Sequence, residues 1–201
     1  MRVHRIPFST NVERVALAAA HKGLEIGWVD HSPHDRSRVR AISGQDLVPV
    51  AEVDGDVVVD SMRIVERIEQ LVPDPPLYPR DPAARARVDV FVEWFNEVWK
   101  GPPNAIEAEL GKPEPDHARI AALGARMRAW LDVFEGLLAH DDYLLGPSFG
   151  AADVCAYPFL KYAAHRDPSD DELFRRILEE HQPLDDGFPR MLAWIERISS
   201  R

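Results

Sequence analysis

Short apolar runs and amphipathic segments alternate through the first third of the chain. Residues 2–6 and 24–29 are short apolar or alternating runs, which predict two strands. Residues 35–43 are polar and weakly periodic, and we expect a short or irregular helix there. A stronger helix lies between the two strands and ends at Gly23; its apolar positions are Val12, Val15, Ala16, Ala19 and Ala20.

The clearest local signal is a hairpin. Residues 48–53 and 57–59 are rich in valine and flank an Asp-Gly-Asp turn at 54–56. β-Branched residues favour strands and an Asp-Gly pair favours a tight turn, so these segments predict an antiparallel hairpin. Asp60 and Ser61 then supply N-cap chemistry to a helix whose apolar positions are Ile64, Val65, Ile68, Leu71 and Val72. The predicted order is strand, helix, strand, helix, strand, strand, helix (βαβαββα).

A proline-rich stretch follows this pattern and divides the chain. Five prolines lie between residues 73 and 82, where they stiffen the backbone and break helices. We therefore expect a first domain over residues 1–76, a linker over 77–82 and a second domain over 83–201. Every periodic segment after the linker has helical spacing, so the fold class is an α/β domain followed by an all-α bundle.

Four apolar patterns predict the helices of the second domain. Residues 151–164 carry only two charges, which predicts a buried central helix. The other three helices are amphipathic, and the first of them is expected to end at Gly101-Pro102-Pro103. Their apolar faces are Val88, Phe91, Val92, Phe95, Val98 and Trp99; Ile120, Leu123, Met127, Trp130, Leu131, Phe134, Leu137 and Leu138; and Phe188, Met191, Leu192, Ile195 and Ile198.

Composition excludes several classes of function. The formal net charge of −10 argues against a surface for nucleic acids or anionic membranes. No apolar stretch approaches the roughly 18 residues that span a bilayer, and the basic start of the chain lacks the apolar core of a secretory signal. A single cysteine, Cys155, allows no internal disulfide, so a reducing, cytoplasmic location is expected. The metal and nucleotide motifs HExxH, CxxC, GxxxxGK[ST] and GxGxxG are absent, and we expect no metal.

Several blocks of the chain resemble cytosolic glutathione transferases when they are taken in order. Phe8-Ser9-Thr10-Asn11 and the residues to Leu24 are similar to the start of the serine-type, tau-like and zeta-like enzymes. The other blocks are Leu47-Val48-Pro49-Val50 with Asp54-Gly55 and Asp60-Ser61, Pro76-Leu77-Tyr78-Pro79 with Asp81-Pro82, and Tyr143-Leu144-Leu145-Gly146 through Phe149-Gly150-Ala151-Ala152-Asp153. The resemblance is to bacterial-like members, and abundant Ala, Arg, Pro and Asp are typical of GC-rich genomes.

The resemblance implies a fold and an activity. The first domain would be a thioredoxin-like glutathione-binding domain and the second the helical domain of the superfamily. Glutathione would be the co-substrate, and its thiolate would be conjugated to a small electrophile or used to isomerise one, as in detoxification. A homodimer is implied as well.

Ser9, Thr10 and Asn11 are the candidate catalytic residues. A free thiol with a pKa of about 8.5 is mostly protonated at neutral pH, and lowering that pKa by two units takes about 2.7 kcal/mol. A hydroxyl that donates to sulfur supplies about 1.5–3 kcal/mol, and the start of a helix adds about 0.3–1 kcal/mol. The resemblance places the activating hydroxyl at Ser9. The alternative is that one of the three side chains is only an N-cap.

The resemblance assigns the glutathione contacts to two segments. Ser61 would bind the γ-glutamyl carboxylate at a helix start, and Asp60 would pair with the ammonium group, although relatives more often have Glu or Gln there. Pro49 would be cis, with the backbone of Val48 recognising the cysteine of the peptide. For the glycine carboxylate, Gln45 is the first candidate, and the alternatives are His34, Arg36 and Arg38. Asp46 departs from the family pattern and is a poor neighbour for a carboxylate.

Further expectations concern the second domain and the acceptor. Phe8 and Trp94 would line the acceptor pocket, with Asn96, Lys100 and Asn104 as polar candidates at its rim, but Trp94 fits a packed core position equally well. Asp153 would cap the helix that follows Gly150. Cys155 is expected as a small buried hydrophobe, which disfavours the cysteine-dependent omega-like and beta-like classes.

Two alternatives to the transferase stay open. The departures at Asp46 and Asp60 favour a non-catalytic binding or scaffold protein with the same fold. A transferase, lyase or hydrolase that uses another low-molecular-weight thiol also fits the sequence, since some GC-rich organisms make such thiols.

Overall fold

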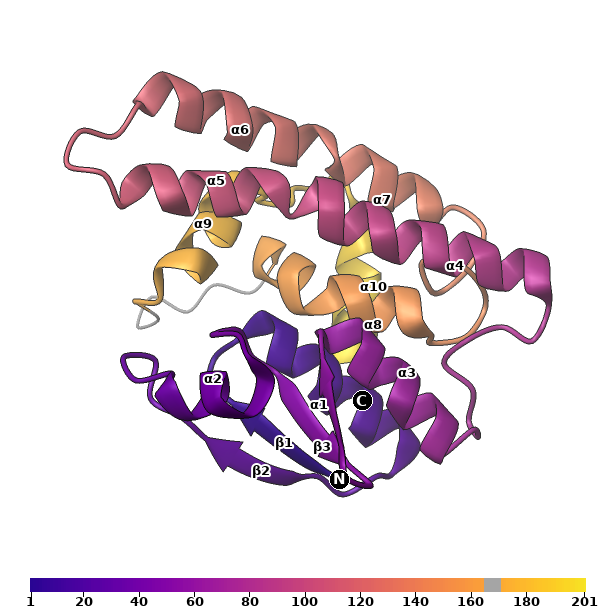
Figure 1. The fold of residues 1–201 in the computed structure, drawn as a ribbon. Helices are drawn as coiled ribbons and strands as arrows, with labels where there is room; N and C mark the ends of the chain where they lie inside the picture. Colours follow the sequence, from indigo (N-terminus) through magenta and orange to yellow (C-terminus); the bar gives the residue numbers. More distant parts are fainter. Residues whose placement is uncertain (165–170) are drawn as a thin grey trace. The chain divides into compact units, whose positions relative to one another are not determined.

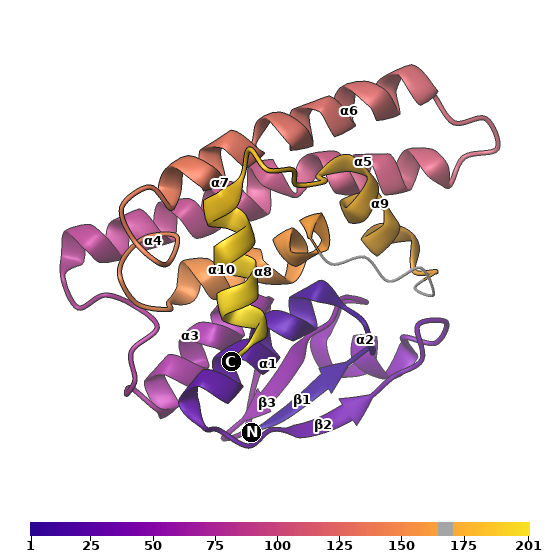
Figure 2. The same cartoon turned by 180° about the vertical axis from the view of Figure 1, so that it is seen from behind.

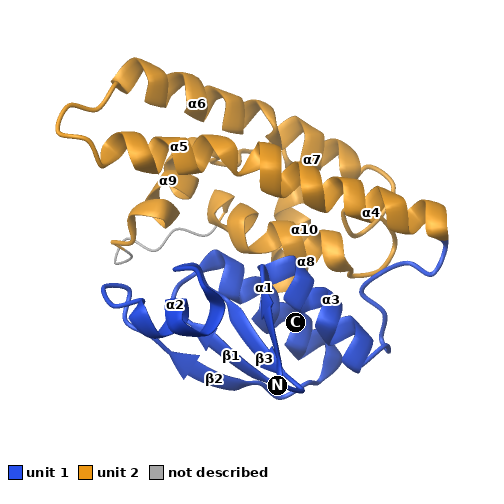
Figure 3. Cartoon of the chain, in the orientation of Figure 1, with its two compact units in different colours: residues 1–81 blue, residues 82–201 orange. Residues whose placement is uncertain are grey.

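The computed structural model describes residues 1–164 and 171–201 and divides into two units, Met1–Asp81 and Pro82–Arg201 (Figure 3). The first unit is built around four short strands, and the second is helical. No helix within the described residues is long and apolar enough to cross a membrane.

The sheet of the first unit mixes parallel and antiparallel pairs (Figure 1). Its strands run in the order β2-β1-β3-β4; β1 and β2 are parallel, whereas β3 is antiparallel to both β1 and β4. The bounds are β1 Arg2–Arg5, β2 Gly27–Asp30, β3 Val50–Val53 and β4 Asp56–Val59. Successive side chains alternate between faces, so the register places Val3, Ala51 and Val53 on one face, where all three are buried.

Three helices complete the first unit and confirm the predicted βαβαββα order. They are α1 Thr10–Lys22, α2 Ser37–Ser43 and α3 Ser61–Leu71. α1 and α3 pack against each other and carry half of the buried apolar residues of this unit. The predicted second strand begins later than expected, because the N–H of Leu24 bonds to the carbonyl of Ala19 at the end of α1. Gly23 adopts the left-handed conformation, at φ +62°, that ends the helix in this way. The resulting bond holds Leu24 at the end of α1 and out of the sheet.

Within the described residues of the second unit, the secondary-structure elements are all helices (Figure 2). Their bounds are α4 Pro82–Trp94, a π-helix Phe95–Trp99, α5 Gly101–Leu110, α6 His117–Ala129, α7 Leu131–Leu137, α8 Ala151–Leu160, a 3₁₀ turn Lys161–Ala163, α9 Leu173–His181 and α10 Pro189–Ser199. α8 is buried over its whole length, which confirms the predicted central helix. The sequence patterns did not identify α5 or α9.

The first long helix differs from its prediction at the Gly-Pro-Pro segment. Gly101 does not end the helical path, because α5 begins there and the buried Pro102 and Pro103 fit its first turn. The preceding π-helix includes a bond from the N–H of Lys100 to the carbonyl of Phe95. This wider turn shifts the register of the apolar face, so Trp99 is buried whereas Val98 is 37% exposed.

Two other apolar faces need correction. The stripe from Ile120 to Leu138 is not one helix, because it is divided at Trp130 between α6 and α7. In α10 the buried indole of Trp194 was missed, whereas Leu192 is exposed at 36%.

A buried lysine fastens the proline-rich stretch to the first unit. The ammonium group of Lys22, at the end of α1, pairs with Glu69 of α3. It also donates to the carbonyls of Pro73 at 3.2 Å and Pro75 at 2.5 Å. Glu69 in turn accepts the N–H of Leu77 at 3.0 Å. One charge pair therefore holds the end of α1, the end of α3 and the chain that follows.

In the second unit, the buried Asp153 joins three separate segments of the chain in a similar way. Its carboxylate accepts the N–H of Gly150 at 2.9 Å, which confirms the predicted helix cap. It also accepts the N–H of Leu144 at 3.0 Å and the indole N–H of Trp194 at 2.8 Å. Burial raises the pKa of Asp153 to about 6, although the three donors oppose this rise.

Replacement of Lys22 by methionine should lower the free energy of unfolding by about 3 kcal/mol, because Glu69 keeps a largely buried charge without its partner. Urea unfolding followed by circular dichroism measures this loss. Arg85→Met is the control, since Arg85 and its partner Asp89 are both partly exposed and the loss of this pair should cost much less. The double variant Lys22→Met/Glu69→Gln should recover part of the loss. A single variant as stable as the wild type would contradict the role of Lys22.

Asp153→Asn should change how stability depends on pH. Because the folded state raises the pKa of Asp153 from 3.8 to about 6, the proton is bound more tightly in the folded chain. The stabilising contribution of this carboxyl is full below about pH 4 and is lost as pH rises through about 6, amounting to about 3 kcal/mol. Urea titrations of both proteins between pH 4 and 7.5 should show the wild type losing stability relative to Asp153→Asn. Parallel curves would contradict this pH dependence.

Candidate functional site

The segments that carry the predicted site residues of the first unit lie at one end of the sheet. The register aligns Arg2 with Gly27 and Glu52, so β1, β2 and β4 all leave the sheet at the end where β3 enters it. The loop with Ser9 follows β1, Val48 precedes β3, and Asp60 follows β4. The sheet therefore brings together the segments that the sequence analysis singled out.

Ser9 is the N-cap residue of α1, but its side chain does not cap the helix. Its backbone is extended, at φ −72° and ψ 122°, and its hydroxyl makes no hydrogen bond to the first helical N–H groups. Ser9 is half-buried, and Thr10, the first residue of the helix, is buried. The simple N-cap alternative thus accounts for the position of Ser9 and not for its hydroxyl.

Asn11 is turned toward a residue that the sequence analysis missed. Its amide oxygen accepts a hydrogen bond from Nη1 of Arg14 at 3.2 Å, and the same nitrogen donates to the hydroxyl of Ser61 at 3.2 Å. The Arg14 side chain is fully buried. The only signal in the sequence was an arginine on the inward side of a helix that has an alanine-rich core face.

At the start of α3, the cap is made by Asp60 and not by Ser61. Asp60 is the N-cap, and its Oδ1 accepts the N–H groups of Met62 at 2.9 Å and Arg63 at 3.1 Å. Ser61 is the first helical residue and is buried. Asp60 has a φ of +74°, a conformation that non-glycine residues rarely adopt and that is frequent at functional sites.

The loop before β3 holds the remaining predicted contacts. The Val48–Pro49 peptide bond is cis, as the resemblance implied. Gln45 is half-buried, and its backbone bonds to the hydroxyl of Ser43. Among the alternatives, His34 and Arg38 are exposed on the loop before α2 and on α2 itself.

Asp46 would repel a carboxylate less strongly than the sequence suggested, because its own charge is paired. Arg40 binds its carboxylate through two nitrogens, at 2.8 and 2.6 Å. These hydrogen bonds hold the pKa of Asp46 below its usual range. Arg36 is also engaged, because it donates to the backbone carbonyl of Asp46 at 3.1 Å. The negative charge of Asp46 is therefore paired with Arg40 of α2.

The two predicted acceptor-pocket residues belong to different units. Phe8 lies beside Ser9 and is 72% exposed, with a φ of +75°. Trp94 is half-buried and packs against Trp130 and Phe134, with ring centroids 5.8 and 5.9 Å away. These contacts fit the core-packing alternative for Trp94. Cys155 is buried in α8, as expected.

A chain of polar side chains along the sheet was missed. The buried His4 bonds to His31 at 2.8 Å through Nδ1 and to Glu52 at 2.6 Å through Nε2. Hydrogen bonds from His4 and Arg2 lower the pKa of Glu52, and burial together with the nearby His4 lowers the pKa of His31. A histidine in a strand with a buried neighbour was the available signal, since a buried polar ring needs a partner.

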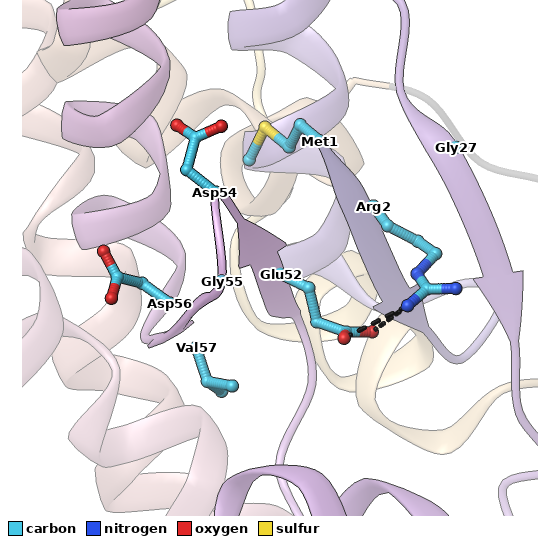
Figure 4. Close-up of a pocket in the computed structure, with 8 residues that line it drawn as sticks. All are labelled: Met1, Arg2, Gly27, Glu52, Asp54, Gly55, Asp56 and Val57. Carbon is cyan, nitrogen blue, oxygen red and sulfur yellow. Dashed lines mark hydrogen bonds and ion pairs between the residues drawn. The ribbon is translucent and has the colours of Figure 1, made fainter.

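The opposite end of the sheet carries a hollow that contains none of the predicted site residues (Figure 4). Its volume is about 410 Å³, and its lining includes the hairpin turn and the start of the chain. Arg2 and Glu52 pair across it at 3.1 Å, as the dashed lines show. Residues 1–164 and 171–201 contain no group of His, Cys, Asp and Glu side chains that could hold a metal ion.

Three characterised proteins are similar to the chain over most of its length. Glutathione S-transferase PARB of Nicotiana tabacum is 27% identical over an alignment covering 100% of this chain and 93% of that protein. Maleylpyruvate isomerase of Ralstonia sp is 29% identical over 78% of this chain and 73% of its own. FtsZ-localized protein A of Caulobacter vibrioides is 26% identical over 77% of this chain and 73% of its own.

Solved structures share the fold across the whole chain. A glutathione S-transferase from Rhodospirillum rubrum F11 has a TM-score of 0.75 at 26% identity, and covers 100% of this chain and 88% of its own. The tau-class enzyme from mango, Mangifera indica, has a TM-score of 0.81 at 16% identity, with the same coverages. Residues 3–76 match the N-terminal domain of glutathione S-transferases, and residues 117–197 match their C-terminal domain. The chain therefore belongs to the glutathione S-transferase superfamily.

Proposed function

We propose that this chain binds glutathione in its first unit and activates the thiol for conjugation to, or isomerisation of, a small electrophile. The observation that carries the proposal is the hydroxyl of Ser9. It stands at the start of α1, yet the helix does not use it as a cap. Ser61, Asp60 and Val48 lie at the same end of the sheet.

The surroundings of Ser9 suit the stabilisation of a thiolate. A hydroxyl that donates to sulfur favours the charged form by about 1.5–3 kcal/mol. The N-terminus of the 13-residue α1 adds about 0.3–1 kcal/mol because its N–H groups are partly positive. Together these two contributions are of the size needed to lower a thiol pKa by about two units. Thr10 and Asn11 stay secondary candidates, although Asn11 already faces Arg14.

The start of α3 suits the γ-glutamyl end of the peptide. Ser61 would donate to the α-carboxylate, and Asp60 would accept from the ammonium group through the oxygen that does not cap the helix. The backbone of Val48 would bind the cysteine residue. Gln45 is proposed for the glycine carboxylate, because Arg36 and Arg40 are already bound to Asp46.

The comparisons support transfer and isomerisation alike. One relative is named as a glutathione S-transferase and another as maleylpyruvate isomerase. Phe8 is proposed as a wall of the acceptor pocket because it is exposed beside Ser9. For Trp94 the contacts favour core packing, since its known neighbours are core aromatics.

The second candidate function is a non-catalytic binding protein. The relative from Caulobacter vibrioides supports it, since that protein is named for its localisation with FtsZ. The replacement of the more usual Glu or Gln by Asp60 also favours it, because one oxygen of the shorter side chain is occupied by the helix. The Ser9 experiment below separates the two functions.

A homodimer in the cytoplasm is proposed from the family. Light scattering at micromolar concentration should give twice the mass of one chain. A monomer under those conditions would contradict the dimer and leave the proposal for the thiol site unaffected.

Ser9→Ala should raise the apparent pKa of the bound thiol toward its free value. At neutral pH the rate should fall about 10- to 100-fold, which corresponds to about 1.4–2.7 kcal/mol in the transition state. The affinity for glutathione should change little, because Ser61, Asp60 and Val48 are untouched. The pH–rate profile with a model electrophile measures the shift.

Three variants serve as controls for this experiment. Thr10→Ala and Asn11→Ala show whether a neighbour carries the role, and Cys155→Ala should leave the activity nearly intact since that thiol is buried in the second unit. If Ser9→Ala keeps both rate and pH profile, the assignment to Ser9 is wrong. If Ser9→Ala, Thr10→Ala and Asn11→Ala all keep the rate and the pH profile, the binding-protein function is favoured.

A further inference from the structure

Arg14 is a fully buried cation between two helix starts. It lies in the second turn of α1, and its Nη1 is 3.2 Å from the amide oxygen of Asn11 and 3.2 Å from the hydroxyl of Ser61 in α3. A guanidinium group stays charged at every physiological pH, and burying it is costly unless its surroundings compensate the charge. A methionine or leucine would fill such a position at lower cost, so this placement calls for a reason beyond packing.

The chemistry of the two partners fixes the direction of one hydrogen bond. Arginine has donors and no acceptor, whereas a serine hydroxyl has one hydrogen and two lone pairs. Ser61 must therefore accept from Arg14, and its own hydrogen must point away from the guanidinium group. The Ser61 side chain is buried in the start of α3, and its role as the acceptor of this bond follows from the chemistry of Arg14 alone.

At the start of α3, few backbone N–H groups remain for an anion, so the hydroxyl of Ser61 becomes an important donor. Asp60 already occupies the N–H groups of Met62 and Arg63, two of the groups that a helix N-terminus offers to an anion. A carboxylate at this point would depend more heavily on the hydroxyl of Ser61. Because this hydroxyl accepts a hydrogen bond from the charged Arg14, it becomes a stronger donor.

We propose that Arg14 is a positioning residue that presents the Ser61 hydroxyl as an obligatory hydrogen-bond donor and thereby selects a carboxylate at the γ-glutamyl end of the thiol substrate. This inference rests on the proposed function, because it deepens the binding role of Ser61. Asn11 acts through Arg14: its amide oxygen holds the guanidinium group from the first turn of α1. The same network would disfavour a substrate whose α-carboxylate is replaced by an amide, since the amide is uncharged.

A purely structural role for Arg14 makes a different prediction. If the side chain only joins α1 to α3, its loss would lower stability and weaken all ligands alike. If it orients Ser61, its loss would selectively weaken ligands that carry the α-carboxylate. The ratio of two affinities therefore separates the roles, because a general loss cancels in the ratio.

The experiment measures binding of S-methylglutathione and of its γ-glutamyl α-carboxamide analogue by isothermal titration calorimetry. The proteins are the wild type, Arg14→Gln, Ser61→Ala and the double variant. The wild type should prefer the carboxylate at least tenfold, and each single variant should reduce this preference to about threefold or less. The double variant should reduce it no further, because both changes remove one interaction.

Two further variants keep the test decisive. Arg67→Gln, also in α3 but bonded to Asp54 and Gln70, should retain the wild-type preference and controls for loss of a positive charge. Asn11→Ala keeps the buried guanidinium group and should reduce the preference about threefold even if Arg14→Gln does not fold. With an electrophile, Asn11→Ala should raise KM for glutathione more than it lowers kcat.

The possible failures are distinguishable. If the wild type binds neither ligand at millimolar concentration, the proposed function is overturned and this inference with it. If the wild type prefers the carboxylate and the Arg14 and Asn11 variants keep the full preference, the inference alone is overturned. Equal weakening of both ligands would assign Arg14 a structural role and likewise overturn it.

Discussion

The antiparallel placement of β3 between β1 and β4 is the constraint on which the first unit depends. It makes β3 enter the sheet at the end where its neighbours leave it, so the loops around Ser9, Val48 and Asp60 share one end. Each strand has only four residues, about 13 Å of extended chain, and the pairing register has little redundancy. A slip by one residue would exchange the faces of Val3 and His4, and would place a histidine in the apolar core.

The sequence predicted the elements whose signals are local. The hairpin, the end of α1 at Gly23 and the burial of α8 follow from turn chemistry and from apolar patterns within one segment. The π-helix at residues 95–99 could not be anticipated in this way. Its apolar residues fit an ordinary helical stripe, and only the observed bond pattern accounts for the exposure of Val98 beside the buried Trp99. The late start of β2 likewise depends on a bond between Leu24 and Ala19 that the strand pattern does not encode.

In the candidate site, too, only the features with a local sequence signal were predicted. The positions of Ser9, Asp60 and Ser61 were predicted from motifs, and the cis bond at Pro49 was implied by resemblance. What the motifs could not distinguish was which side chain caps its helix. Asp60 caps α3 and Ser9 does not cap α1, although a short polar residue at a helix start fits both roles. Arg14 was missed because its partner Ser61 is 47 residues away in the sequence.

The contacts of Lys22 have a consequence for where the first unit ends as a folding unit. Three groups that surround this buried ammonium come from α3 and from the chain just beyond it, namely Glu69, Pro73 and Pro75. A polypeptide that stopped at Val72 would contain every strand and helix of the unit and still leave Lys22 in the interior without the two carbonyls. It would also deprive Glu69 of the N–H of Leu77. The shortest chain that could fold as this unit must therefore extend several residues beyond α3, because it has to include the carbonyl groups that bind the ammonium group of Lys22.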